Sequence, residues 1–386
     1  MKGFFKRLGD TWSILGITLL ILLLIEVFFR IYLSFTPSPD ERANADCYGN
    51  ADWVQAYFEE FEKCNASQWE PYLYWKRVPF KGEFINVNEQ GHRATVTKEH
   101  PLSQRQPELK LFFFGGSAMW GTGARDAYTI PSLTGNEMIM KGFSPSIVNF
   151  GESGYVSTQD LLSLMNELKN GNVPDVAIFY SGVNDIFSSY QSGKAGIPQN
   201  ESNRRKEFNT LQEKKKSFLV FLKSLKTLAT IKFLLNQFGP DQSLIPEQPV
   251  ADSESLAEKT VHQYNENIRV VNALAKEYGF QAMFYWQPTI FDKLFRTGYE
   301  EAAMGKAENL RPFLEKVNSL LFAEDLRYEH IGFYNLAALF ANTHGPLFID
   351  WCHAGEEGNL LISQRIAHDL MPVLDSLNIT REVNDE

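Results

Sequence analysis

Cysteine is scarce in this chain, and the sequence lacks the usual motifs of a metal or cofactor site. Its 386 residues include three cysteines, and no spacing of cysteine and histidine resembles a metal-binding pattern. Closely spaced glycines between residues 115 and 123 partly imitate a nucleotide-binding loop, but their spacing is wrong and no lysine follows them. We therefore expect neither a metal nor a cofactor.

The chain also lacks the basic surface that nucleic-acid binding requires. Asp and Glu outnumber Lys and Arg by 47 to 37, which leaves a net charge of −10. Binding to a phosphate backbone depends on clustered Lys and Arg. The one basic cluster, at Arg204–Lys206 and Lys214–Lys216, is typical of a solvated helix face. We expect no nucleic-acid partner.

The remaining composition is that of a folded protein. The chain is 44% hydrophobic and 22% charged, which is typical of globular domains. No internal repeat or low-complexity segment is visible. The length is sufficient for a large core and about one to three domains.

An apolar run near the N-terminus predicts a transmembrane helix. Trp12–Phe35 supplies the roughly 20 apolar residues that a spanning helix needs. Its two charged residues, Glu26 and Arg30, are four apart and can neutralise each other on one helix face. Basic residues precede the run and acidic residues follow it, so the N-terminus is expected in the cytoplasm and the main domain in the periplasm or outside the cell. The alternative is a cleaved signal peptide, although Ala43–Ala45 lies too far beyond the run for a usual cleavage site.

Two of the cysteines, Cys47 and Cys64, lie close together in a segment expected outside the cytoplasm. Disulfides persist in such compartments, so a bridge between these two residues is expected. Cys352 stands between Asp350 and His353. It is either a catalytic thiol or a small buried residue, and the second interpretation is favoured.

We expect the chain to fold in three parts. Residues 1–36 form a cytoplasmic stub and the membrane anchor, and residues 37–106 form a membrane-proximal region that packs on the main domain. That region contains a predicted helix at Asp52–Lys63 and a short extended piece at Ile85–Asn88. Residues 107–386 form the main domain.

Apolar runs alternate with helical patterns along the main domain. A parallel strand that is buried on both faces is a continuous apolar run bounded by turn residues. Such strands are predicted at Leu109–Phe114, Ser146–Asn149, Val176–Ser181, Gln281–Trp286 and, more weakly, His330–Asn335. Helices are predicted at Ile130–Met140, Gln159–Leu168 and Ala257–Tyr278. This alternation predicts an α/β fold, namely a three-layer α/β/α sandwich with a mostly parallel, flavodoxin-like sheet.

Residues 188–256 interrupt the alternation. Lys214–Phe238 carries an apolar stripe typical of an amphipathic helix or helical hairpin, and a proline-rich loop follows it. We interpret the segment as a helical insertion beside the site. Its stripe either packs in the core, which is the favoured interpretation, or contacts substrate.

Ser117, Asp350 and His353 supply the groups of a serine-dependent catalytic site. Ser117 follows the first strand in the block Gly115–Gly121, and the other two form an Asp-x-x-His pair near the C-terminus. A serine hydroxyl becomes a nucleophile when a base removes its proton, and His353 is the predicted base. Asp350 is predicted to orient the imidazole. The nearest rival base, His344, has no acid at the matching spacing.

The sequence also offers three donors for the oxyanion that forms during acyl transfer. The backbone N–H of Ser117 lies at a strand-to-helix turn, and the side-chain amide of Asn184 follows the strand at Val176–Ser181. The third donor is the N–H of Gly154, because a glycine lets a ligand approach the backbone closely. Parallel strands end at one edge of a sheet, so these groups are expected to meet there.

Four residues resemble the marks of the SGNH (GDSL-like) hydrolase superfamily, in the family's order: Ser117, Gly154, Asn184 and His353. The resemblance covers about residues 107–375 apart from the insertion. The family's serine block usually has Gly-Asp-Ser, whereas Gly116 replaces the aspartate here. The block Gly-Gly-Ser-x-x-x-Gly is similar to that of a membrane-anchored subgroup. The G-x-S-x-G elbow of α/β-hydrolases is absent from the sequence.

The resemblance implies a serine-dependent acyl-ester hydrolase or acyltransferase that acts outside the cytoplasm. Some anchored relatives add or remove acetyl groups on polysaccharides, which implies O-acetyl groups of carbohydrate or cell-surface polysaccharide as the substrate. Trp120, Trp286 and Trp351 are candidates for lining a sugar groove, with core packing as the alternative. The rival functions are a lipase or thioesterase for longer acyl esters and a non-catalytic scaffold of an envelope or polysaccharide complex.

Overall fold

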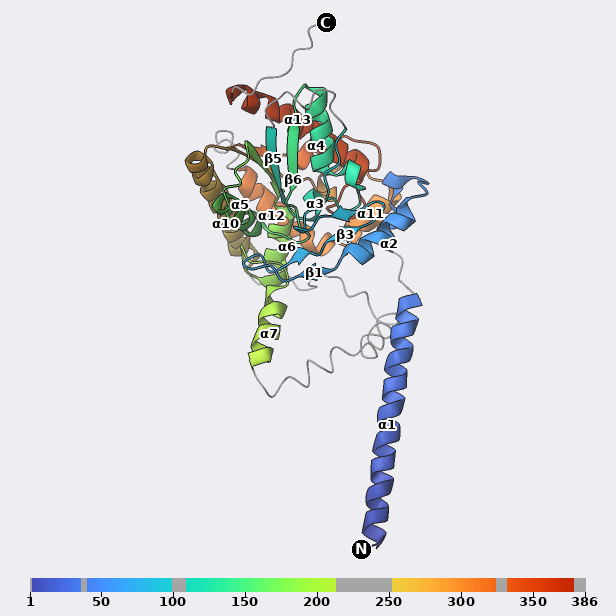
Figure 1. The fold of residues 1–386 in the computed structure, drawn as a ribbon. Coiled ribbons are helices and arrows are strands. Elements are labelled where there is room, and N and C mark those ends of the chain that lie inside the picture. Colours follow the sequence, from blue (N-terminus) through green and yellow to red (C-terminus); the bar gives the residue numbers. More distant parts are fainter. Residues whose placement is uncertain (1, 36–39, 99–108, 213–251, 324–331, 378–386) are drawn as a thin grey trace. The chain divides into compact units, whose positions relative to one another are not determined.

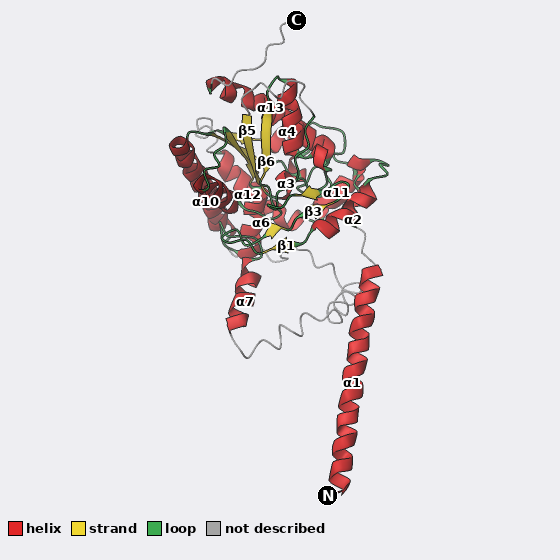
Figure 2. Cartoon of the chain, in the orientation of Figure 1, coloured by secondary structure: helices red, strands yellow, loops and turns green. Residues whose placement is uncertain are grey.

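The computed structural model describes residues 2–35, 40–98, 109–212, 252–323 and 332–377 (Figure 1). These residues belong to two compact units, which are described separately. One unit lies within residues 1–39 and 202–244, and the other within residues 40–201 and 245–386. All the strands among the described residues belong to the second unit, and Figure 2 shows them surrounded by helices.

The first unit contains the predicted apolar helix. Helix α1 runs from Lys2 to Phe35, and its stretch Thr11–Ile31 is long and apolar enough to cross a bilayer. Arg30 Nε donates a hydrogen bond to Glu26 Oε1 at 2.8 Å, as expected for opposite charges four residues apart. The prediction of a candidate membrane-spanning helix is therefore confirmed.

The predicted insertion is described only in part. Helix α7 runs from Glu201 to Gln212 and carries the basic residues Arg204–Lys206. The predicted amphipathic helix at Lys214–Phe238 lies outside the described residues, as does the second half of the basic cluster.

Five parallel strands form the central sheet of the second unit. Their order across the sheet is β6-β5-β7-β8-β9, which is the 2-1-3-4-5 order of flavodoxin-like folds. The strands are β5 (Leu109–Gly115), β6 (Pro145–Asn149), β7 (Val176–Ser181), β8 (Gln281–Trp286) and β9 (Phe333–Asn335). All four pairings between neighbouring strands are parallel. The predicted fold class is confirmed.

Helices cover both faces of the sheet. One face is covered by α5 (Ser157–Lys169), α6 (Val183–Ser192), α10 (Ser253–Tyr278) and α12 (Arg311–Phe322). The other is covered by α4 (Ile130–Met140) and α13 (Glu356–Ser376), which lie side by side in Figure 1. The strand side chains alternate between these two layers, so Phe112 and Phe114 pack in the first apolar cluster and Leu111 and Phe113 in the second.

Short elements connect these layers. They are α3 (Ser117–Trp120), η3 (Asp126–Tyr128), η5 (Ile290–Asp292), α11 (Gly298–Gly305), η6 (Glu308–Leu310) and η9 (Ala337–Phe340), where η denotes a 3₁₀ turn. Helix α3 is the one that places a site residue, because it begins directly after β5.

Residues 40–98 pack on the main domain. Their elements are η1 (Glu41–Asn44), η2 (Asp46–Tyr48), α2 (Val54–Cys64), β1 (Ser67–Gln68), β2 (Lys76–Arg77), β3 (Phe80–Lys81) and β4 (Asn86–Val87). The apolar side of α2 joins Trp120 and Ile349 of the main domain in a third buried cluster. Arg93 forms an antiparallel bridge to Asn149, the last residue of β6.

The expected disulfide is not formed. Cys47 and Cys64 are both free thiols, so the prediction of a bridge between them is wrong for this structure. Cys47, in η2, faces Gly355, whereas Cys64 ends α2 and its carbonyl accepts from Arg77. The two cysteines therefore have different neighbours, although they are close in sequence.

Candidate active site

The nucleophile candidate Ser117 stands at a sharp turn between β5 and α3. Gly115 ends the strand with φ +153°, and Gly116 is the N-cap of the helix. Gly121 ends α3 with φ +104°, in the left-handed region where a side chain would be strained. Ser117 is therefore the first helical residue, and its N–H lies in the turn whose N–H groups have no acceptor within the helix.

Ser117, His353 and Asp350 form one hydrogen-bonded chain. The Oγ atom of Ser117 lies 2.6 Å from His353 Nε2, and His353 Nδ1 lies 2.7 Å from Asp350 Oδ2. A carboxylate only accepts, so the ring proton resides on Nδ1 and Nε2 accepts from the serine hydroxyl. This is the tautomer and geometry that a general base requires.

Asp350 is fixed from several sides. Its Oδ1 accepts from the backbone N–H groups of Cys352 and His353, at 3.0 and 2.8 Å. Burial alone would raise the pKa of this carboxyl, but the charge and hydrogen bond of His353, together with Arg42, hold it well below its ordinary value. Asp350 is therefore a carboxylate that stabilises the imidazolium.

Cys352 contacts this chain through Sγ, which lies 3.5 Å from His353 Nδ1, whereas His344 lies elsewhere. Burial, followed by the nearby charge of Asp350, raises the pKa of the Cys352 thiol well above its ordinary value, so this thiol stays protonated. His344 is exposed and stacks on Phe295, with ring centroids 3.9 Å apart. The favoured interpretation of Cys352 as a small buried residue fits this environment.

Potential metal-ligand atoms of Asp350, Cys352 and His353 lie within 4.8 Å of one another. Two of these groups already hydrogen-bond each other, and the third is a protonated thiol. A thiol binds metal as the thiolate, so this donor set fits a catalytic dyad better than a metal site.

Asn184 lies directly against the serine block. Its Nδ2 donates to the carbonyl of Tyr155 at 2.8 Å, which leaves the second amide hydrogen for a ligand. A Cβ atom built on Gly116 would overlap Nδ2 of Asn184. Gly116 thus leaves room for the Asn184 amide in its observed position.

Gly154 lies beside Asn184 in the loop after β6. It has φ +80°, which favours glycine, and a Cβ there would lie 3.0 Å from Gln199 Oε1 and 3.4 Å from the ring of Trp75. Gln199 Nε2 donates to Asn184 Oδ1 at 3.0 Å. Gln199 thus contacts the surroundings of both predicted oxyanion donors, and sequence reasoning missed it because no motif surrounds it.

The predicted site residues are partly exposed, unlike the strand residues before them. Ser117, Gly154, Asn184, Asp350 and His353 are all half-buried. The strand residues before them, such as Phe114 and Tyr180, are buried. The structure therefore brings the predicted residues to one solvent-accessible edge of the sheet, where the parallel strands end.

Two of the three tryptophans do not line a groove, so those predictions are wrong. Trp120 is fully buried between the guanidinium groups of Arg77 and Arg93, which lie 4.0 and 4.3 Å from its ring centroid. Trp286 is buried under Gly182, and its Nε1 donates to Asn318 Oδ1 at 3.1 Å. A tryptophan near the end of a strand can pack into the core or face solvent, and the sequence pattern does not distinguish these two placements.

Trp351 is the exception, since it is half-buried beside the Asp-x-x-His turn. It packs against Phe187 of α6 with ring centroids 6.3 Å apart. It therefore remains a candidate for substrate contact.

Arg77 links the loop that contains Glu152, Ser153 and Gly154 to helix α3, which begins at Ser117. Its Nη2 donates to Ser153 Oγ at 2.7 Å, and its backbone N–H donates to Glu152 Oε2 at 2.9 Å. The same guanidinium stacks on Trp120, three residues after Ser117. This buried contact fixes the loop of Gly154 relative to the nucleophile.

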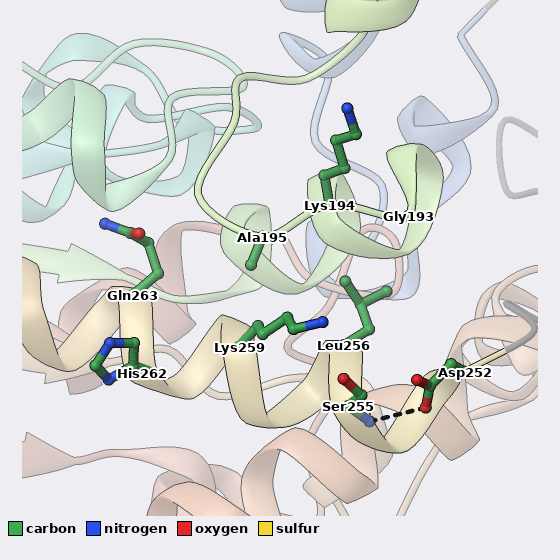
Figure 3. Close-up of a pocket in the computed structure, with 9 residues that line it drawn as sticks. All are labelled: Gly193, Lys194, Ala195, Asp252, Ser255, Leu256, Lys259, His262 and Gln263. Atoms are coloured by element: carbon green, nitrogen blue, oxygen red, sulfur yellow. Dashed lines mark hydrogen bonds between the residues drawn. The ribbon is translucent and has the colours of Figure 1, made fainter.

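The pocket drawn in Figure 3 is lined by none of these residues. It is lined by the end of α6 and the start of α10, including Lys194, Lys259 and His262. The dashed line marks Asp252 capping α10 through Ser255. This pocket adds nothing to the catalytic arrangement.

Comparisons with known proteins bear on this arrangement. A family model, GDSL-like lipase/acylhydrolase, matches residues 111–366, a range that includes the serine, glycine, asparagine and histidine described above. A comparison with curated proteins found no match.

Several solved structures match about two thirds of this chain at low sequence identity. The acetyl xylan esterase AlAXEase shares 12% identity over 68% of this chain and 100% of its own, with a TM-score of 0.34. Axe2, an acetylxylan esterase from Geobacillus stearothermophilus, shares 16% over 68% of this chain and 94% of its own, with a TM-score of 0.34. A G-D-S-L family protein from Veillonella parvula shares 11% over 70% of this chain and 99% of its own, with a TM-score of 0.37.

Proposed function

The chain belongs to the GDSL-like lipase/acylhydrolase family, and we propose that it forms an acyl-enzyme on Ser117 with His353 as general base. The observation that carries this proposal is the continuous chain from Ser117 Oγ through His353 to Asp350, with contacts of 2.6 and 2.7 Å. At these distances, Ser117 can pass its proton to His353 without a large movement of either side chain.

Acylation begins when Ser117 Oγ attacks the ester carbonyl and its proton passes to His353 Nε2. The imidazolium that forms is stabilised by Asp350, which remains ionised. His353 then returns the proton to the leaving alkoxide, so the alcohol departs and the acyl group stays on Ser117. Water completes hydrolysis by the same route, and a second alcohol in its place gives acyl transfer.

The oxyanion is held by the N–H groups of Ser117 and Gly154 and by the free amide hydrogen of Asn184. Preorganised donors of this kind contribute about 2.7–4 kcal/mol each to the transition state. Gln199 keeps the Asn184 amide oriented, because it donates to the amide oxygen and leaves Nδ2 to face the site.

We propose an acetyl ester of a carbohydrate as the substrate. A small acyl group suits the site because Trp75 and Gln199 lie close to Gly154. The hairpin that carries Trp75 also presents Trp69 and Tyr72, which are 67% and 75% exposed. Exposed aromatic faces of this kind stack on the C–H faces of sugar rings.

The same hairpin is hydrogen-bonded to the loop that contains Ser153, Gly154 and Tyr155. Trp75 Nε1 donates to the Ser153 carbonyl at 2.9 Å, and Tyr155 Oη donates to the Trp75 carbonyl at 2.5 Å. A sugar bound on these rings would therefore sit beside the loop that supplies the Gly154 N–H.

The experiment is a comparison of esters on the purified full chain. Acetylated oligosaccharides should be deacetylated with a higher kcat/KM than the p-nitrophenyl esters of acids of eight or more carbons. Trp69→Ala should raise KM for the saccharide and leave p-nitrophenyl acetate hydrolysis unchanged. A preference for the long acyl esters would contradict the acetyl assignment and support the lipase alternative.

We also propose that α1 is retained as a membrane anchor, with the catalytic unit outside the cytoplasm. The apolar stretch Thr11–Ile31 and the basic residues before it support this orientation. A reporter fused after residue 386 should be active only outside the cytoplasm, and the mature protein should keep Lys2. A mature N-terminus near Asp46 would instead identify a cleaved signal peptide.

A further inference from the structure

The segment that follows α1 contacts the turn that carries Asp350. Tyr299 of α11 donates through Oη to the carbonyl of Ile349 at 2.7 Å, and the same hydroxyl lies 3.5 Å from the Glu41 carbonyl. Cys47 of η2 lies against Gly355, where a Cβ would be 2.8 Å from its Sγ. Residues 41–47 therefore pack around both ends of the Asp-x-x-His turn.

Arg42 is the charged residue at this contact. Its Nε and Nη2 donate to the two oxygens of Asp40 at 2.9 and 2.6 Å. Its guanidinium also lies over the rings of Phe58 and Phe61, 5.5 and 5.1 Å from their centroids. The remaining nitrogen, Nη1, is 3.8 Å from Asp350 Oδ2.

That oxygen of Asp350 is the one that accepts from His353 Nδ1. Arg42 and the imidazole therefore share one carboxylate oxygen. We propose that Arg42 is a positioning residue for the catalytic dyad, which fixes Asp350 beside His353 and offsets part of the carboxylate charge that the imidazole experiences. This inference rests on the proposed function of Ser117 and His353.

Polar groups from four parts of the chain face the Asp350–His353 pair. Cys352 belongs to the same turn, and Ser117 comes from α3. Arg42 and Asp40 come from the segment before α2, and Tyr299 comes from α11. The thiol and the phenol are neutral, because burial raises the pKa of both side chains. Of the described residues named here, Arg42 and Asp40 carry the charges that act on the Asp350–His353 pair from outside the turn.

The electrostatic pattern supports this assignment. Burial lowers the pKa of Arg42, but the hydrogen bond that it donates to Asp40 and then the charges of Asp350 and Asp40 raise it well above its ordinary value. Arg42 also contributes to the lowering of the Asp350 pKa described above. Each group therefore favours the charged form of the other.

The predicted effect has a definite sign. Without the guanidinium, the Asp350 carboxylate attracts the imidazolium that forms in the reaction more strongly, because Arg42 no longer offsets its charge. Arg42→Gln should therefore move the acid limb of the pH–rate profile upward. Asp40→Asn removes a negative charge and leaves more of the guanidinium charge for Asp350, so it should move the limb downward.

The test uses the second-order rate at which a fluorophosphonate modifies Ser117 in the full chain, measured from pH 5 to 9. The reaction needs His353 as a base and does not depend on knowing the natural ester. Arg42→Gln should shift the acid limb up by about 0.3–1 pH unit, Asp40→Asn should shift it down, and Arg42→Lys should leave it within about 0.2 unit of wild type. Arg269→Gln, at a 75% exposed side chain, is the control and should leave it unchanged.

The outcomes separate this inference from the proposed function. If Ser117 reacts normally but the limb does not move in Arg42→Gln or Asp40→Asn, then Arg42 is structural and the inference is overturned. Should Arg42→Gln fail to fold, the downward shift in Asp40→Asn still decides the question, since that variant keeps the arginine. If the wild-type serine never reacts, the proposed function fails, and this inference fails with it.

Discussion

Gly116 and Asn184 are packed so closely that a side chain at position 116 would have to displace the Asn184 amide. A Cβ there would overlap Asn184 Nδ2, which donates to the Tyr155 carbonyl, while Gln199 donates to Oδ1 of the same amide. A larger residue at position 116, such as the family's usual aspartate, would need a different placement of the Asn184 side chain. Gly116 is therefore matched to the position of the proposed oxyanion donor Asn184.

This contact predicts a large effect from one added methyl group. Gly116→Ala must displace the Asn184 amide, so kcat/KM for p-nitrophenyl acetate should fall by about 10²–10³, the effect of losing one oxyanion donor. Gly298→Ala is the matched control, because a Cβ there meets nothing within 4 Å, and its activity should equal wild type. Equal activity of Gly116→Ala and Gly298→Ala would contradict this account of position 116.

Direct removal of the amide should give the same loss. Asn184→Ala should lower kcat/KM by about 10²–10³ while Ser117 still reacts with a fluorophosphonate, because one donor of three is removed and the nucleophile is intact. Combining it with Gly116→Ala should add little, since both changes remove one group. Asn166→Ala on α5 serves as the control. Losses that multiply in the double variant would show that Gly116 acts through something other than the amide.

Stability should depend on a buried ion pair under the Asp-x-x-His turn. Lys293 and Glu300 are both 0% exposed and lie 2.6 Å apart, and Glu300 also accepts from the N–H groups of Leu347 and Phe348. Lys293→Met leaves a buried carboxylate without its partner and should lower the free energy of unfolding by about 3–5 kcal/mol.

Urea unfolding of the purified full chain measures this difference. Lys306→Met breaks an exposed pair with Glu41, which should contribute no more than about 1 kcal/mol. Equal unfolding midpoints for the two lysine variants would contradict the structural role of the buried pair.

Asp185, next to Asn184, should make stability depend on pH. Burial raises the pKa of this carboxyl from 3.8 to about 6, against hydrogen bonds from Ser157. Between those values the folded chain keeps a proton that the unfolded chain has lost, so this group makes stability fall as pH rises from about 4 to about 6. Asp185→Asn should remove that part of the decline, which is about 3 kcal/mol.

The measurement is urea unfolding at pH 4 and at pH 7 for wild type and variant. Asp52→Asn, at an exposed position, is the control and should keep the wild-type slope. If Asp185→Asn lost as much stability between the two pH values as wild type does, the raised pKa would be wrong.

Much of the fold was accessible from the sequence because the strands are continuous apolar runs. The bounds of β7 and β8 match their predicted ranges, and β9 is described as a shorter strand at Phe333–Asn335. Parallel strands bring their C-terminal ends to one edge, so Ser117 and Asn184 could be placed together without any alignment.

Other features depend on packing that local patterns do not contain. Trp120 follows a nucleophile in the sequence, but two buried arginines on a distant segment enclose it. Arg42 and Gln199 belong to no motif, and their contacts with Asp350 and Asn184 arise only when remote loops meet.

The most direct test of the central claim is the kcat for p-nitrophenyl acetate in Ser117→Ala, His353→Ala and the double variant of the full chain. Residues that act as one unit are non-additive, so each single change should lower kcat by about 10³–10⁶-fold and the double variant should be scarcely worse. A Ser117→Ala enzyme that keeps its esterase activity, or losses that multiply in the double variant, would contradict the assignment of Ser117 and His353 as nucleophile and base.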